Sequence, residues 1–79
     1  MDHPSRVIHE MDRMQRRLKF SIADLFDKHA KVQVCQFHHE LNNKSKLYGV
    51  HEQAHILGIS TNVINKRIEK YKDYKIRNS

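Results

Sequence analysis

The chain has 79 residues, enough for one domain, because a chain this short buries only about 60–65% of its unfolded surface and cannot support two independent cores. Fifteen Lys and Arg against nine Asp and Glu give a formal net charge of +6. The excess lies in residues 41–79, which carry eight basic and three acidic side chains. This concentration of positive charge favours polyanionic binding partners such as nucleic acids. The alternative is that the charges only keep the protein soluble.

The composition also bears on compartment and fold class. The single cysteine, Cys35, excludes an intramolecular disulfide and indicates a reducing compartment such as the cytoplasm. No apolar run reaches the ~20 residues of a membrane-spanning helix, and the polar opening MDHPSR lacks the apolar core of a signal peptide. Pro4 is the only proline and there are two glycines, so little in the sequence interrupts a helix. We therefore expect an all-α fold, a small bundle of about four helices. From the lack of a long apolar run we expect no membrane partner.

The first expected helix spans about residues 5–19. Spacings of four, three and four place one apolar stripe on it, formed by Val7, Met11, Met14 and Leu18. Such a stripe packs on its own domain or on a symmetry mate, and we predict a homodimer through these four residues.

A second helix is expected over residues 22–41. Ser21 followed by Asp24 resembles a capping box, and Ile22, Leu25, Phe26, Ala30, Val34, Phe37 and Leu41 continue at helical spacing. The alternation in KVQVCQF leaves a short strand as the alternative for residues 31–37. The polar tract NNKSK, residues 42–46, predicts an exposed loop that separates helices 1–41 from a DNA-binding segment 42–79 within one compact domain.

The stretch LGISTNVINKRIEKY, residues 57–71, has the pattern of a turn followed by a second helix. Gly58 directly after the short helix HEQAHIL can adopt the left-handed conformation that stops a helix, and Ser60 and Thr61 are N-cap candidates. Ile64, Ile68 and Tyr71 form an inward stripe, whereas the opposite face is polar. This pattern is typical of a helix-turn-helix, with a plain helical hairpin as the alternative.

The polar face of this second helix suits nucleic acid. Asn can bond bidentately to adenine and Lys to guanine in the major groove. The basic side chains suited to phosphate contacts, which position a protein without reading sequence, are Lys44, Lys46, Arg67, Lys70, Lys72, Lys75 and Arg77.

The run Ala54, Leu57, Gly58, Ile59, Ile64, Asn65, Lys66 and Ile68 resembles the helix-turn-helix of lambda-type phage Cro repressors. The ending RIEKY is similar to the C-terminal helix of the bacterial factor-for-inversion-stimulation protein and related activator domains. Both resemblances cover only about residues 50–72. They imply base-reading positions at Thr61, Asn62, Asn65 and Lys66, a phosphate contact at Gln53, and a phage, plasmid or bacterial source.

The seven histidines require a test for metal binding. Cys35, His38, His51 and His55 have nearly the ligand spacing of a zinc finger with one Cys replaced. However, Asn42 and Tyr48 occupy the positions where a finger has its buried apolar residues, so we predict neither a metal nor a cofactor. Cys35 is expected to be a buried small hydrophobe, and the sequence has no nucleophile, paired-carboxylate or glycine-loop motif that would indicate an enzyme.

The leading hypothesis is a sequence-specific protein that binds double-stranded DNA as a dimer and regulates transcription or organises the nucleoid. The alternative is a small adaptor that binds a host transcription or nucleoid protein through its N-terminal helices, where Met11 and Met14 could make adaptable contacts. RNA binding through Tyr48, Tyr71 and Tyr74 is a third possibility.

Overall fold

A computed structural model describes residues 4–44 and 48–78, with side chains described from residue 8 onward. Within these ranges every regular element is helical: α1 (Pro4–Leu18), the 3-10 helix η1 (Ile22–Phe26), α2 (Val32–Lys44), α3 (Val50–Leu57) and α4 (Thr61–Arg77). The expected small all-α bundle is therefore confirmed.

Helix α1 matches the first expected helix, and it ends where the chain turns left-handed. The backbone N–H of Lys19 bonds to the carbonyl of Gln15 at 2.9 Å, with φ of Lys19 at 58°. A non-glycine residue pays about 1–2 kcal/mol for this conformation. The chain changes direction at this turn, and the next residue, Phe20, lies in the core with only 3% of its surface exposed.

The prediction of one continuous helix over residues 22–41 is wrong, because two helices replace it. At the start of η1 the carboxylate of Asp24 accepts from the backbone N–H of Ser21 at 2.9 Å, as the predicted capping box requires. At the break, the carboxylate of Asp27 accepts from the backbone N–H of His29 at 3.0 Å, and this local bond gives the backbone an alternative to helix. The sequence did not reveal the break because Leu25 and Ala30, on either side of it, are both buried and so continue the apolar spacing of a single helix.

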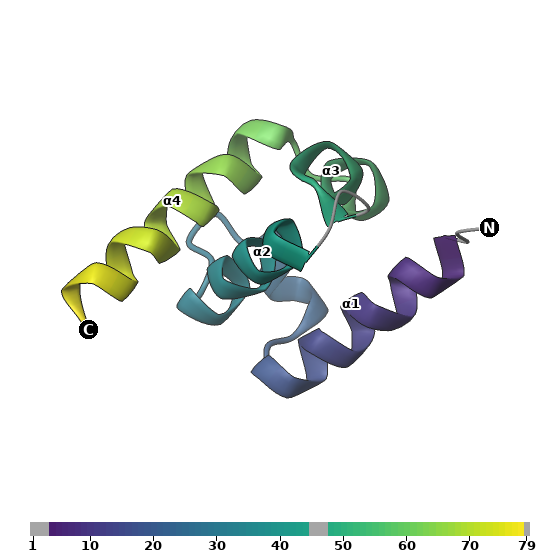
Figure 1. Cartoon of the computed structure of the whole chain (residues 1–79), viewed down its shortest axis with the longest axis horizontal. Coiled ribbons are helices and arrows are strands. Elements are labelled where there is room, and N and C mark those ends of the chain that lie inside the picture. Colours follow the sequence, from purple (N-terminus) through teal and green to yellow (C-terminus); the bar gives the residue numbers. More distant parts are fainter. Residues whose placement is uncertain (1–3, 45–47, 79) are drawn as a thin grey trace.

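Helix α2 occupies the centre of the molecule. It covers most of KVQVCQF, so the helix predicted there is confirmed over the strand alternative, and it continues through residues 42–44, which were predicted to be a loop. Residues 45 and 46 of that predicted loop lie outside the described ranges. Figure 1 shows α1, α3 and α4 arranged around α2.

The core forms where α2 meets its neighbours. Val34, Phe37 and Leu41 on α2 are at most 1% exposed. The rings of Phe20 and Phe37 pack edge to face, with centroids 5.1 Å apart, an arrangement worth about 0.5–1.5 kcal/mol beyond the area it buries. On α4, Ile64 and Ile68 are also buried, as the inward stripe predicts.

The link between α3 and α4 has the predicted turn. Gly58 is left-handed, with φ 69° and ψ 31°, and its N–H bonds to the carbonyl of Ala54 at 2.9 Å. Ser60 is the N-cap of α4, and its hydroxyl accepts from the backbone N–H of Val63 at 3.2 Å. The chain thus changes direction between the 8-residue α3 and the 17-residue α4 within three residues.

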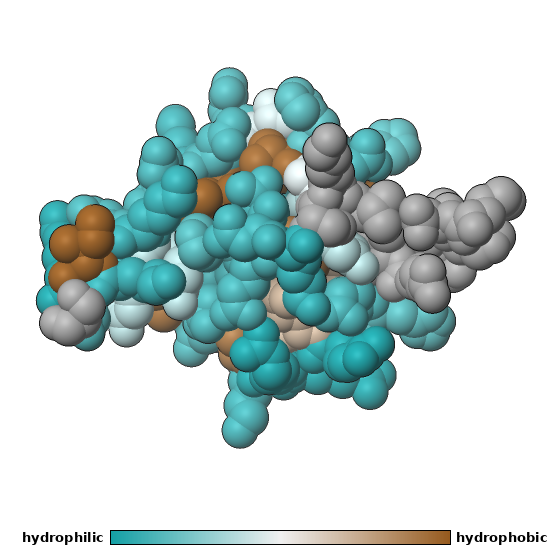
Figure 2. Space-filling view, viewed as in Figure 1, coloured by the Kyte–Doolittle hydropathy of each residue, from teal (hydrophilic) through white to brown (hydrophobic). Residues whose placement is uncertain are grey.

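Hydrophilic residues cover most of the face shown in Figure 2, where hydrophobic residues form only small separate patches. In the parts of the chain that the structure describes, no helix combines the length and apolar character needed to cross a bilayer.

Replacement of Gly58 tests the turn. A Cβ at this position would meet nothing within 4 Å, so the cost comes from the left-handed backbone alone. We expect Gly58→Ala to lower the free energy of unfolding by about 1 kcal/mol and Gly58→Asn by less, because Asn tolerates this conformation. Urea denaturation followed by circular dichroism measures both. Equal losses for Ala and Asn would show that the conformation of residue 58 is not what matters.

Candidate nucleic-acid interface

The first two turns of α4 present the polar side chains that the sequence assigned to base reading. Asn62, Asn65 and Lys66 are exposed, whereas Thr61 is half-buried at the start of the helix. Ile64 and Ile68 anchor the opposite side of the same turns in the core. The helix therefore offers amides and an ammonium group on a rigid, outward surface.

Acidic side chains limit this surface to the beginning of the helix. Glu69 and Asp73 follow on the exposed side of α4, with side chains that are 73% and 60% exposed. Lys72 lies 3.9 Å from Glu69, and Arg77 lies 3.1 Å from Asp73. Carboxylates repel nucleic acid, so the later turns of α4 are less suited than the first two to lie deep in a groove, although their lysines remain exposed.

A buried polar network fixes α4 from behind. Arg67 on α4 donates to Nε2 of His38 on α2 at 3.1 Å and to the backbone carbonyl of Asp27 at 3.0 Å. Nδ1 of His38 lies 2.8 Å from Oε1 of Gln53 on α3. The network thus joins α2, α3, α4 and the turn before α2.

The network also determines which nitrogen of His38 carries the proton. Nε2 of Gln53 donates to the carbonyls of Tyr48 at 2.7 Å and of His38 at 3.2 Å, which fixes the orientation of the amide. Oε1 therefore faces Nδ1 of His38, and Nδ1 must donate. The remaining nitrogen, Nε2, has a free lone pair and accepts from Arg67. His38 is neutral in this arrangement.

Burial lowers the pKa of His38 to about 4; the bond to Gln53 opposes this shift, and the charge of Arg67 adds to it. Burial likewise lowers the pKa of Arg67. Among the described residues no buried side-chain nitrogen or oxygen lacks a hydrogen-bond partner. A fully satisfied network of this kind favours one arrangement of the helices.

Two of the predicted phosphate contacts are corrected by this network. Gln53 is 0% exposed and Arg67 is 8% exposed, and their polar atoms bond to groups inside the fold. Neither can reach a phosphate at the surface. The sequence could not show this, because Gln and Arg at these positions are equally compatible with an outward and an inward orientation.

The other predicted phosphate contacts are distributed unevenly. Lys70, Lys72, Lys75 and Arg77 are exposed along α4. Lys75 lies over the ring of Tyr71, 5.8 Å from its centroid. Lys44 is at the end of α2 and pairs with Glu10 at 2.6 Å, whereas Lys46 lies outside the described ranges.

The predicted dimer seam is corrected as well. Met11 is 6% exposed and Met14 is 3% exposed, and both belong to the protein's own core together with Phe37 and Leu41 on α2. Leu18 is half-buried against the same core, and the side chain of Val7 lies outside the described part. The stripe packs inward, so a second copy cannot use it in this fold.

The zinc-finger spacing does not produce a cluster. Cys35 and His38 are fully buried, whereas His51 and His55 are exposed on α3. Within residues 4–44 and 48–78, no three His, Cys, Asp or Glu side chains are placed to share a metal ion. Burial raises the pKa of the Cys35 thiol, which therefore stays protonated.

One exposed cation near α4 was not assigned a role from the sequence. Lys28 lies on the turn between η1 and α2 and lines a cavity together with Lys66 and Lys70. The sequence signal for this turn is the tripeptide DKH, in which an Asp can bond the backbone two residues later.

Comparison of the chain with protein-family models, curated proteins and solved structures finds no match.

Removal of Gln53 tests the network. We expect Gln53→Met, which keeps the approximate shape but removes the amide, to lower the free energy of unfolding by about 2–4 kcal/mol, because His38 and the Tyr48 carbonyl lose their buried partners. Urea denaturation measures the loss. The control is His51→Gln on the exposed side of α3, which should change stability by less than about 0.5 kcal/mol. A loss for Gln53→Met as small as that of the control would contradict the network.

The low pKa of His38 predicts a dependence of stability on pH. The unfolded chain takes up a proton at the ordinary pKa of 6.5, whereas the folded chain does so only at about 4. Stability is therefore complete above pH 6.5 and falls as the pH falls from 6.5 towards 4. We expect a loss of about 2 kcal/mol between pH 7 and pH 5 from His38.

Nuclear magnetic resonance of the imidazole rings separates His38 from its neighbours. His39 contributes in the same direction, because burial lowers its pKa too. The His38 ring should titrate at about pH 4. A midpoint for His38 near 6.5 would mean that the ring is not buried against Gln53 and Arg67.

Proposed function

We propose that the protein binds double-stranded DNA through the first two turns of α4 and acts as a sequence-specific transcriptional regulator or an architectural factor of the nucleoid. The observation that supports this most directly is the combination of a left-handed Gly58 turn with exposed Asn62, Asn65 and Lys66. A helix that is buried on one side and polar on the other can enter a major groove without unfolding.

The chemistry of these side chains suits base edges. Asn62 and Asn65 can each bond bidentately to adenine, and Lys66 can bond the O6 and N7 acceptors of guanine. Lys70, Lys72 and Lys75, further along the helix, would contact phosphates. Lys44 would also be available, because an exposed ion pair such as that with Glu10 contributes only about 0–1 kcal/mol and phosphate can compete with it.

A dimer remains part of the proposal, since two copies would read two half-sites about 34 Å apart. The surface that joins the copies must differ from the stripe of Met11, Met14 and Leu18, which is occupied within the monomer. The same burial removes the Met11 and Met14 surface from the adaptor alternative. Sedimentation velocity with and without duplex measures the number of copies.

Substitutions on α4 should separate base reading from phosphate binding. We expect Asn62→Ala and Asn65→Ala each to reduce discrimination between preferred and random duplexes by about 1–3 kcal/mol, because base-edge bonds are lost. Lys72→Ala should weaken all duplexes alike and reduce the salt slope by about 1. Selection from a random duplex pool at two salt concentrations, followed by fluorescence anisotropy, measures both effects.

The matched control is Lys19→Ala, which removes an exposed charge at the end of α1, a helix on the other side of α2 from α4 (Figure 1). It should change duplex affinity less than Lys72→Ala does. If the Asn62 and Asn65 variants retain wild-type affinity and discrimination, then α4 is not the reading helix. Selected sites without two-fold symmetry would contradict the dimer.

A further inference from the structure

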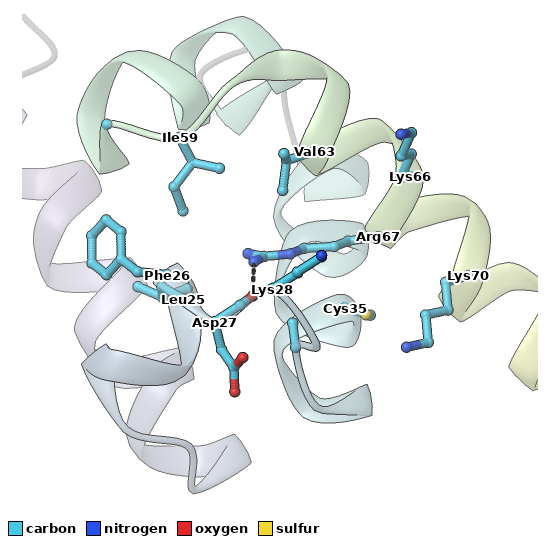
Figure 3. Close-up of a pocket in the computed structure, with 12 residues that line it drawn as sticks. Leu25, Phe26, Asp27, Lys28, Cys35, Ile59, Val63, Lys66, Arg67 and Lys70 are labelled. Atoms are coloured by element: carbon cyan, nitrogen blue, oxygen red, sulfur yellow. Dashed lines mark hydrogen bonds between the residues drawn. The ribbon is translucent and has the colours of Figure 1, made fainter.

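A cavity of about 530 Å³ opens between the turn that follows η1 and the first half of α4. In Figure 3, Phe26 and Ile59 lie at one end of this cavity, Val63 and Lys66 lie along α4, and Lys70 lies at the other end. The cavity adjoins the base-reading side of α4, with which it shares Lys66.

Several apolar side chains line the cavity, beside the charged groups of Asp27, Lys28, Lys66, Arg67 and Lys70. Leu25, Ala30 and Cys35 are buried beneath it, and Ile59 is half-buried at its edge. Phe26 is 63% exposed and Val63 is 37% exposed, so two further apolar side chains line it while open to solvent. Exposed apolar side chains around a hollow are typical of a binding surface.

Three lysines line the cavity without carboxylate partners among the described residues. Lys28, Lys66 and Lys70 are exposed, and none of them forms an ion pair with any residue in 8–44 or 48–78. Other described cations do form such pairs; for example, Lys31 lies 3.5 Å from Asp24. Positive charge that the protein does not neutralise is therefore gathered at this cavity.

The other two charged groups that line the cavity, Asp27 and Arg67, carry opposite charges, so the three lysines leave the cavity positive. The carboxylate of Asp27 accepts from the backbone N–H of His29, and Figure 3 shows it pointing away from Arg67. Arg67 adds positive charge but bonds to His38 and to the Asp27 carbonyl within the fold. An incoming carboxylate would thus meet Lys28, Lys66 and Lys70.

We propose that this cavity binds an acidic segment of a partner protein, which inserts one large apolar side chain between Phe26 and Val63 and places carboxylates against Lys28, Lys66 and Lys70. The lysines favour acidic residues on either side of the bound segment's centre, and the apolar side chains of the cavity favour a large apolar residue at its centre. The DNA backbone fits the lining less well. Phosphates could pair with the lysines, but they would leave the apolar surface of Phe26, Ile59 and Val63 unfilled.

Occupation of the cavity would also affect α4. Lys66 and Lys70 line the cavity and are, in the proposed function, a base contact and a phosphate contact. An acidic segment bound there would neutralise both side chains, so the segment and duplex DNA would compete. The peptide site itself does not require α4 to bind DNA, so the two proposals can fail separately.

Peptide display from a random library of about twelve residues, selected on the full-length protein, tests the proposal. We expect enrichment of sequences in which one aromatic or long aliphatic residue is flanked by Asp or Glu, with affinity that falls as salt is added. Fluorescence anisotropy with one enriched peptide then measures the variants. Lys28→Glu should weaken this peptide about fivefold to tenfold, and Val63→Asp at least about tenfold.

Lys19→Glu is the matched control, because it makes the same charge change at an exposed lysine that does not line the cavity. It should leave peptide affinity within about twofold, as expected for a screened distant charge. Thermal unfolding of each variant checks that the fold is retained. If Val63→Asp fails to fold, Phe26→Ser replaces it, since Phe26 is largely exposed.

Three outcomes would overturn the proposal. The selection could enrich no sequence, or only sequences without acidic residues. The enriched peptide could bind the Lys28→Glu and Val63→Asp variants as tightly as the wild type. Finally, Lys28→Glu could weaken a duplex of about 20 base pairs as strongly as Lys70→Glu does, with no effect on the peptide, which would make the cavity part of a DNA interface instead.

Discussion

The bonds between His38, Gln53 and Arg67 are the interaction on which the arrangement of this small bundle depends. Each residue comes from a different helix, and together they orient α3 and α4 on α2 and tie α4 to the turn before α2. An apolar core of this size would permit several packings of short helices. The network restricts them, because any shift leaves a buried donor or acceptor without a partner, which costs about 1–3 kcal/mol per group.

This anchoring explains why most of the exposed side of α4 can be polar, with Val63 and Ile76 as exposed apolar exceptions. The helix does not need its own outer surface for stability, since Ile64, Ile68 and Arg67 fix it from behind. The outer side chains are therefore available for binding. The same rigid attachment keeps Asn62 and Asn65 at a fixed position relative to the rest of the fold, as recognition of base edges requires.

The distribution of ion pairs gives the molecule two distinct regions. Near α1 and α2, most exposed cations are matched by carboxylates, as in the pairs of Arg17 with Glu40 and Lys44 with Glu10. Near the first half of α4 the lysines have no such partners among the described residues, and they lie beside both the proposed reading surface and the apolar cavity. A polyanion and an acidic protein segment would both be attracted to this side, which is why their competition is a natural consequence of the fold.

The sequence by itself determined the all-helical class, the first helix, the turn at Gly58 and the inward and outward sides of α4, because each follows from local periodicity or from a glycine that must be left-handed. It did not determine the break at Asp27, where the bond of the Asp27 carboxylate to the backbone N–H of His29 overrides a continuous apolar spacing. Only the tertiary structure decided that Met11 and Met14 face the protein's own core, and that Gln53 and Arg67 face inward. Whether an apolar stripe or a polar side chain faces the core or the solvent depends on the residues that pack against it, and those residues are far away in the sequence.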